Sequence, residues 1–321
     1  MEEIKKSRRK KRWIISICTI GIILCLGVSG WLVWAYEQHP QQITKVKKTE
    51  HRIKSKIKSA SKGTSQVKAA SESKDVPKEK PKTKRAPTNH NEAADSWTFK
   101  VEQVREDMKG PVNPDKPKVV FLTFDDGPSS NDTPQVLNIL AEHNVHATFF
   151  LVGNRITPET QALVQQEYDS GHGIAVHSFT HDYKILYPNN VPNAQAILDE
   201  ANKTRDLMKS FLGDKFDTRV WRYPGGTMSW KNLDESKSLL EKDNFTWMDW
   251  NAADGDGLGA SAPKTVQAAL NYHAMSLTVY PQSNVEIILM HDASDKQVTV
   301  QALPEIIKYY KDRDYQFGIL E

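Results

Sequence analysis

The chain has 321 residues, of which 38% are hydrophobic, with a mean hydropathy of -0.59 and a formal net charge of +3. Segments 1–12 and 37–96 carry +5 and +8, so residues 97–321 carry -10. An acidic folded part disfavours a nucleic-acid-binding domain. A disulfide-stabilised scaffold is excluded because Cys18 and Cys25, the only cysteines, lie in an apolar stretch.

That apolar stretch, residues 13–36, contains 24 consecutive residues without a charge. About 20 apolar residues cross a bilayer as a helix, and Trp13 and Trp31 match the aromatic residues found at membrane interfaces. The basic residues of 1–12 predict that the N-terminus is cytoplasmic and that the rest of the chain lies outside. A cleaved signal peptide is the alternative, but the run is long for one. We expect an uncleaved membrane anchor.

Residues 37–96 are rich in Lys, Ser, Pro and Thr, and they contain no Trp or Phe. Such a segment buries too little apolar surface to offset its ordering entropy, so we expect a disordered basic linker. It is a solvated spacer or a polycation that contacts an anionic cell-wall polymer. Residues 97–116 form a lead-in to the folded domain, which we place at 117–321.

Short apolar runs and helix-like stretches alternate through the remainder of the chain. The runs predict seven strands, at 119–124, 147–153, 173–177, 219–223, 245–250, 285–291 and 315–320. Apolar residues at three- and four-residue spacing predict helices at 134–143, 158–170, 192–212, 232–241, 263–275 and 300–311. This alternation indicates an α/β fold with a mainly parallel sheet. We expect a small or distorted barrel, and a doubly wound open sheet is the alternative.

Reactive side chains follow the carboxyl ends of several predicted strands, where a parallel barrel gathers its functional groups. His177 and His181, four residues apart, can share one face of a helical turn and bind one ion. Asp125 or Asp126 would complete a set of two histidines and one carboxylate. Such a set suits Zn²⁺, Co²⁺, Ni²⁺ or Mn²⁺, with Zn²⁺ as the default.

Two further strand ends carry charged residues in apolar surroundings. Arg222 needs a carboxylate partner there, and Asp125 is the natural one. His291 follows the apolar run 287–290, and Asp249 is a possible partner that would orient its imidazole and favour its protonated form.

Taken together, these motifs resemble those of the NodB-type polysaccharide deacetylases, which form carbohydrate esterase family 4. The matching segments are TFDDGP at 123–128, HSFTH at 177–181, RYPGG at 222–226, DW at 249–250 and LMH at 289–291. The resemblance implies a distorted (β/α) barrel of seven or eight mainly parallel strands. The anchor, linker and C-terminal domain together resemble membrane-anchored peptidoglycan N-acetylglucosamine deacetylases.

The resemblance also implies a role for each matching residue. Asp125 would be the catalytic base, positioned by Arg222, and His291 the catalytic acid, tuned by Asp249. One divalent metal would be held by Asp126, His177 and His181. The substrate would be contacted by Tyr223, Gly225, Trp250 and Leu289, with the Gly225 N–H as oxyanion donor. Two departures bear on the substrate groove. The third motif reads Arg222-Tyr223-Pro224-Gly225 where the family often has Arg-Pro-Pro-Tyr, and Thr246 stands where the fourth motif often has a second aspartate.

The implied activity is metal-dependent removal of acetyl groups from N-acetylglucosamine units of cell-wall peptidoglycan. Chitin oligomers, poly-N-acetylglucosamine and acetylxylan are alternative substrates. A catalytically silent wall-glycan-binding protein is a further alternative, disfavoured because a binding module needs neither an acid nor a base. A glycosidase would need two carboxylates that flank the glycosidic bond.

Overall fold

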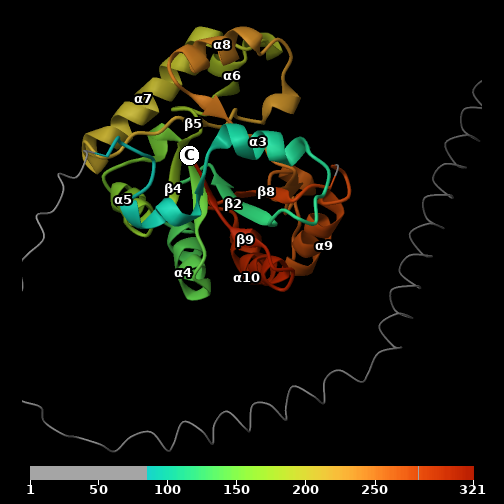
Figure 1. Ribbon diagram of the computed structural model, residues 1–321. Helices are drawn as coiled ribbons and strands as arrows, with labels where there is room; N and C mark the ends of the chain where they lie inside the picture. The colour runs from blue at the N-terminus through green and yellow to red at the C-terminus, as the bar shows by residue number, and fades with distance from the viewer. Residues whose placement is uncertain (1–84, 281) are drawn as a thin grey trace, which may run out of the picture. The chain divides into compact units, whose positions relative to one another are not determined.

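A parallel β-sheet organises the protein in the computed structural model, which describes residues 85–280 and 282–321 (Figure 1). Its strands follow the order β6-β5-β4-β3-β2-β8-β7, and β9 (Gln316–Phe317) pairs with β2. The central strands are β2 (Val119–Asp125), β3 (Ala147–Leu151), β4 (Gly173–Val176), β5 (Val220–Trp221) and β8 (Val285–His291). Every pairing is parallel, as the alternating sequence pattern predicts.

The two outer strands of this sheet come from one short segment. The run at 245–250, expected as a single strand, instead forms β6 (Thr246–Trp247), and β7 (Ala252–Ala253) follows after four residues. The Met248 N–H donates to Trp221 on one sheet edge, and the Asn251 N–H donates to Ile287 on the other. The segment therefore draws the two edges together, and the sheet curves as a (β/α) barrel does rather than as an open doubly wound sheet.

Helices surround the strands, and all six expected helices are present. They are α4 (Thr133–His143), α5 (Gln161–Asp169), α7 (Ala194–Leu212), α8 (Asp234–Lys242), α9 (Val266–Ser276) and α10 (Gln297–Lys311). Side-chain caps fix two of the starts: Asn193 accepts from the Ala196 N–H, and Thr265 accepts from the Ala268 N–H. Two short helices were not expected from the sequence, α3 (Val101–Lys109) and α6 (Tyr183–Leu186).

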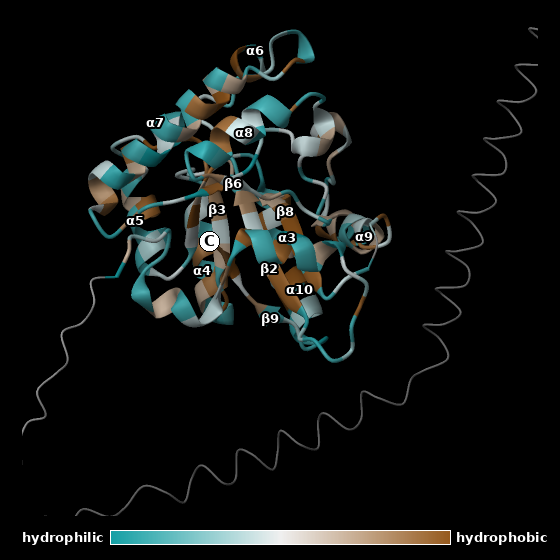
Figure 2. Ribbon diagram, turned by 45° about the horizontal axis from the view of Figure 1, so that its top comes forward, coloured by the Kyte–Doolittle hydropathy of each residue, from teal (hydrophilic) through white to brown (hydrophobic). Residues whose placement is uncertain are grey.

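Alternate residues of each strand enter two separate cores, because successive side chains point to opposite sheet faces. In β2, Val120, Leu122 and Phe124 pack in the cluster that contains the surrounding helices. Val119 and Phe121 face the barrel interior, which is filled by Val101, Val104, Phe150, Ala175, Val220, Met248, Val285, Ile287 and Leu320. Helix α3 thus contributes to this interior core, and Figure 2 shows the apolar strands enclosed by helices of mixed hydropathy.

The folded domain begins earlier than the sequence suggested. Residues 85–96 were expected to belong to the linker, but η2 (Glu92–Trp97) is a 3₁₀ helix, and Asn89 donates to the Leu320 carbonyl at 2.8 Å. The adjoining β1 (Thr98–Phe99) pairs in parallel with β10 (Ile319–Leu320). The amino-terminal part of the domain is therefore held by the end of the chain.

The expected basic tail, membrane helix and most of the linker lie outside the described residues. Within the part of the chain that the structure describes, no helix has the length and apolar character needed to cross a membrane.

Candidate active site

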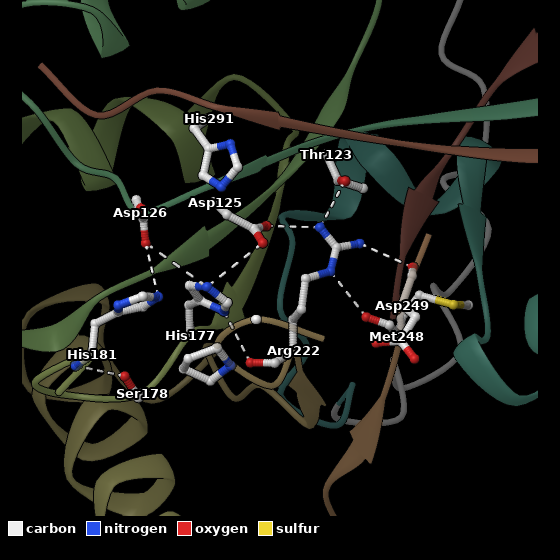
Figure 3. Close-up of polar contacts among 12 residues, drawn as sticks. Thr123, Asp125, Asp126, His177, Ser178, His181, Arg222, Met248, Asp249 and His291 are labelled. Atoms are coloured by element: carbon white, nitrogen blue, oxygen red, sulfur yellow. Dashed lines mark hydrogen bonds and ion pairs between the residues drawn. The ribbon is translucent and has the colours of Figure 1, made fainter. Parts of the chain in front are cut away.

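The interior face of the barrel turns from apolar to polar at the carboxyl ends of its strands. The alternation that places Phe121 inside also places Thr123 and Asp125 inside, and Ile287 is followed by Leu289 and His291. In the same way Ala175 leads to His177, and Val220 leads to Arg222. The β2–β8 register pairs Asp125 with His291. Figure 3 shows the side chains of Thr123, Asp125, His177, Arg222 and His291 gathered in one site.

Asp126, His177 and His181 bring three potential ligand atoms within 4.8 Å of one another. The Asp126 Oδ1 atom lies 3.8 Å from His177 Nε2 and 3.4 Å from His181 Nε2. That oxygen is buried and has no hydrogen-bond partner among the described residues. A buried carboxylate oxygen normally has a partner, so an orphaned oxygen facing two imidazoles fits a metal site. The predicted ligand set is thus assembled.

His177 is prepared to act as a metal ligand. Its Nδ1 lies 2.9 Å from the Arg222 carbonyl oxygen, to which it must donate, so the lone pair is left on Nε2. Burial lowers the pKa of His177 to about 4, which keeps the ring neutral at ordinary pH. A neutral imidazole with a free Nε2 is the form that binds a cation.

His181 reaches the site by a loop, not by the helical turn expected from the sequence. Ser178 and His181 both have positive φ angles, 71° and 56°, and helix α6 starts only at Tyr183. Glu200 of α7 fixes this loop: its Oε2 accepts from the Phe179 and Thr180 N–H groups, each at 3.0 Å. Its Oε1 accepts from the Thr180 hydroxyl at 2.6 Å. Nothing local in the sequence marked Glu200, because its partners lie about 20 residues away.

The predicted pairing of Asp125 with Arg222 is confirmed. Arg222 is fully buried, and its Nη1 donates to Asp125 Oδ1 at 2.7 Å and to Thr123 Oγ1 at 2.8 Å. Its Nε donates to the Met248 carbonyl at 2.9 Å. The guanidinium also stacks on Phe150, with its carbon 3.9 Å from the ring centroid. These contacts fix Asp125, whose Oδ2 lies 3.6 Å from His177 Nε2.

His291 is partnered by Asp256, so the expected pairing with Asp249 is wrong. The His291 ring nitrogen Nδ1 lies 2.7 Å from Asp256 Oδ1, and the backbone N–H of His291 donates to Asp256 Oδ2 at 2.9 Å. Burial alone would lower the pKa of His291, but the charge and hydrogen bond of Asp256 raise it to about 9. Gly257 leaves room for the ring, because a Cβ there would lie 3.0 Å from His291 Cε1.

Asp249 lies on the other side of the site. It accepts from the Thr227 N–H at 3.0 Å and from the Thr227 hydroxyl, and its own carbonyl accepts from Arg222 at 3.2 Å. It therefore braces the loop that follows Gly226. The only sequence signal for Asp256 was a pair of aspartates set among glycines at 254–257, a pattern that a surface turn also produces.

The four expected substrate contacts have different positions. Gly225 and Gly226 have φ angles of +82° and +74°, and a Cβ on Gly226 would lie 2.5 Å from Trp250, which packs over this turn. Leu289 is half-buried on the same face of β8 as His291. Tyr223 is fully buried, and its hydroxyl lies 3.1 Å from Ser236 Oγ, so its side chain belongs to the core and does not reach the groove.

The chain is similar in sequence and in fold to known polysaccharide deacetylases. The family model "Polysaccharide deacetylase" matches residues 112–240. A peptidoglycan-N-acetylglucosamine deacetylase of Bacillus cereus is 32% identical over 200 residues, which cover 62% of this chain and 68% of the relative. The corresponding PgdA enzyme of Listeria monocytogenes is 45% identical over 208 residues, 64% of this chain and 38% of the relative. The solved structure of a Streptococcus mutans CE4 esterase is 44% identical, with a TM-score of 0.69, and the match covers 74% of this chain and 98% of that one.

Proposed function

Because this chain belongs to the polysaccharide deacetylase family of carbohydrate esterases, we propose that it removes acetyl groups from N-acetylglucosamine units of cell-wall peptidoglycan. The observation that carries the proposal is the separation of tasks in the site. Asp126, His177 and His181 converge on one point, while Asp125 and His291 hold partners that suit a base and an acid. The choice of peptidoglycan is supported by two relatives that are named as peptidoglycan deacetylases.

A divalent metal fits the three-residue set, and we propose Zn²⁺, with Co²⁺, Ni²⁺ or Mn²⁺ as alternatives. Bound there, the metal would supply Lewis acidity, polarising the acetyl carbonyl and acidifying a water molecule. The chain's own residues account for the remaining steps.

Asp125 acts as general base in this proposal. Arg222 occupies its Oδ1, which leaves Oδ2 to accept a proton from the attacking water. The oxygen of that water forms a bond to the acetyl carbon, and the Gly225 N–H stabilises the negative charge that develops on the carbonyl oxygen.

His291 acts as general acid. Its pKa of about 9 keeps it protonated at neutral pH, so it can donate a proton to the glucosamine nitrogen as the carbon–nitrogen bond breaks. The products are acetate and a free amine on the sugar. Leu289, half-buried beside His291, would line the pocket for the acetyl methyl group together with Trp250.

We further propose that residues 13–36 anchor the enzyme in the cell membrane, with the N-terminus cytoplasmic and the catalytic domain facing the wall. The basic segment that follows would span the intervening space and contact anionic wall polymers. The support is the uncharged run of 24 residues and the +5 and +8 charges on either side of it. Recovery of the full-length protein in the soluble fraction of lysed cells would contradict this location.

Acetate release by the full-length protein tests the activity. The enzyme is treated with a chelator, resupplied with Zn²⁺, Co²⁺ or Mn²⁺, and compared on peptidoglycan, chitooligomers and acetylxylan. Metal-dependent acetate from peptidoglycan is the expected result. Acetate release from chitooligomers or acetylxylan alone would show that the substrate is that polymer and not peptidoglycan. Absence of release from any polymer by the metal-loaded protein would favour a catalytically silent glycan-binding protein.

A further inference from the structure

Two carboxyl groups behind His291, one fully buried and one largely buried, share a single hydroxyl group. Thr299, at the start of α10, has its Oγ1 2.7 Å from Asp254 Oδ2 and 2.9 Å from Asp256 Oδ2. Asp254 and Thr299 are both fully buried. Asp254 also accepts from the Asp256 N–H at 3.1 Å. A continuous chain of contacts therefore runs from Asp254 through Thr299 and Asp256 to His291.

The number of hydrogen atoms available for these contacts determines how many of the two carboxyl groups are protonated. A threonine hydroxyl has one hydrogen and can make only one full-strength, linear hydrogen bond as a donor. If both carboxyls were ionised, one of the two short contacts of Thr299 would bring lone pairs together without a hydrogen. Both short contacts become full hydrogen bonds when one carboxyl holds a proton and donates it to Thr299, which then donates its own hydrogen to the other carboxyl.

The surroundings identify which carboxyl is protonated. Asp256 faces cations: it pairs with His291, and the Lys296 Nζ donates to its carbonyl oxygen at 3.0 Å. Although burial favours the neutral acid, the charge of His291 holds the pKa of Asp256 below its usual value. Asp254 has no such neighbour among the described residues, and burial, followed by the charge of Asp256, raises its pKa above the usual value of an aspartic acid.

The remaining titratable neighbours of this segment do not supply a positive charge. His273 of α9 lies beside Ala253, and burial lowers its pKa to about 4, so it is neutral. Tyr272 of the same helix packs its ring over Gly255. These surroundings favour Asp254, and not Asp256, as the group that carries the proton.

We propose that Asp254 is a positioning residue: as a protonated acid it donates to Thr299, Thr299 donates to Asp256, and Asp256 remains ionised and holds His291 in place. The series of hydrogen bonds from Asp254 to His291 is inferred from the interatomic distances. Only its role, to prepare His291 as the general acid, rests on the proposed function. This series of hydrogen bonds would allow two carboxyl groups to lie close together in a buried site while only one of them is charged.

The test measures the pKa of His291. NMR of labelled histidine monitors its titration in the full-length, Zn²⁺-loaded protein. Asp254→Asn keeps a donor toward Thr299 and an acceptor for the Asp256 N–H, so the pKa of His291 is expected to stay at its wild-type value. Asp256→Asn is the matched comparison and should lower that pKa by about 1–3 units, because it removes the partner charge. A fall of about one unit in Asp254→Asn would show that Asp254 is ionised and would overturn the proposal.

A second pair of variants tests positioning. Asp254→Leu removes both contacts and is expected to reduce kcat about tenfold with little change in KM, whereas Asp254→Asn retains kcat. Equal kcat in the two variants would contradict a positioning role. If Asp254→Leu does not fold, the titration of Asp254→Asn still decides the protonation state. Absence of acetate release by the wild type would overturn the proposed function but leave the titration result intact.

Discussion

Asp125 and Asp126 are adjacent in sequence, yet their carboxylates have different partners. Asp125 ends β2 and is held by Arg222 at 2.7 Å, whereas Asp126 has a φ of 71° and places Oδ1 3.4 Å from His181 Nε2. The change in backbone conformation between them sends one carboxylate toward the guanidinium and the other toward the imidazoles. One pair of residues can thus supply two functions.

The two aspartates should therefore respond differently to the same substitution. Asp125→Asn is expected to retain the metal and lose about 10²–10⁴ in kcat, because it removes only the base. Asp126→Asn is expected to lose metal and activity together, because it removes a ligand. Metal content after dialysis and acetate release measure the two effects. Full activity in Asp125→Asn would contradict its assignment as the base.

The alkaline limit of activity should depend on Asp256. A general acid must be protonated before it reacts, so activity is expected to fall as the pH rises through the pKa of His291, about 9. Asp256→Asn removes the charge that raises this pKa and should move the limit to lower pH. Asp249→Asn is the matched control, because Asp249 contacts Thr227, and it should leave the limit in place. A shift of the alkaline limit in Asp249→Asn but not in Asp256→Asn would show that Asp249, and not Asp256, raises the pKa of His291.

Glu200 should control the metal site through the loop that carries His181. Glu200→Ala removes the acceptor for two backbone N–H groups and one hydroxyl, and is expected to weaken metal affinity about 10–100-fold. Glu200→Gln can accept the N–H groups and donate to Thr180, so it should restore much of that affinity. Asp199→Asn, at the neighbouring exposed position, is the control. Calorimetric titration with Zn²⁺ measures the affinity, and unchanged binding in Glu200→Ala would exclude this role.

The stability of the fold should fall in acid partly because of His172, which is remote from the candidate site. It is 3% exposed, and its Nδ1 accepts from the Ala147 N–H at 3.2 Å, so the folded state requires the neutral ring. Burial, assisted by His146, lowers its pKa to about 3. The unfolded state therefore binds a proton below about pH 6.5 that the folded state does not, and stability is lost as the pH falls from there toward 3.

His172→Asn tests this contribution. Its Oδ1 can accept the same N–H without titrating, so the free energy of unfolding in urea should depend less steeply on pH between 6.5 and 4 than in the wild type. Equal slopes for the two proteins would show that His172 does not contribute to the acid sensitivity.

The amino-acid sequence by itself determined the alternation of strands and helices and most of the site. The alternation of side chains along a strand is a local property of the sequence, and it also determines which residues point inward. Asp125, His177, Arg222 and His291 could therefore be assigned to one site at the strand ends. The Asp125–Arg222 pair followed from the need of a buried guanidinium for a carboxylate.

The tertiary structure alone decided the partner of His291, the loop of His181 and the folding of residues 85–96 with the domain. Asp256 meets His291 because the segment at 246–253 crosses from one sheet edge to the other before it reaches β8. Asp249 lies within that segment, before β7 begins, and contacts Thr227 instead. Contacts of this kind join residues tens of positions apart, and their formation depends on the path of the backbone, which the local periodicity of side chains does not encode.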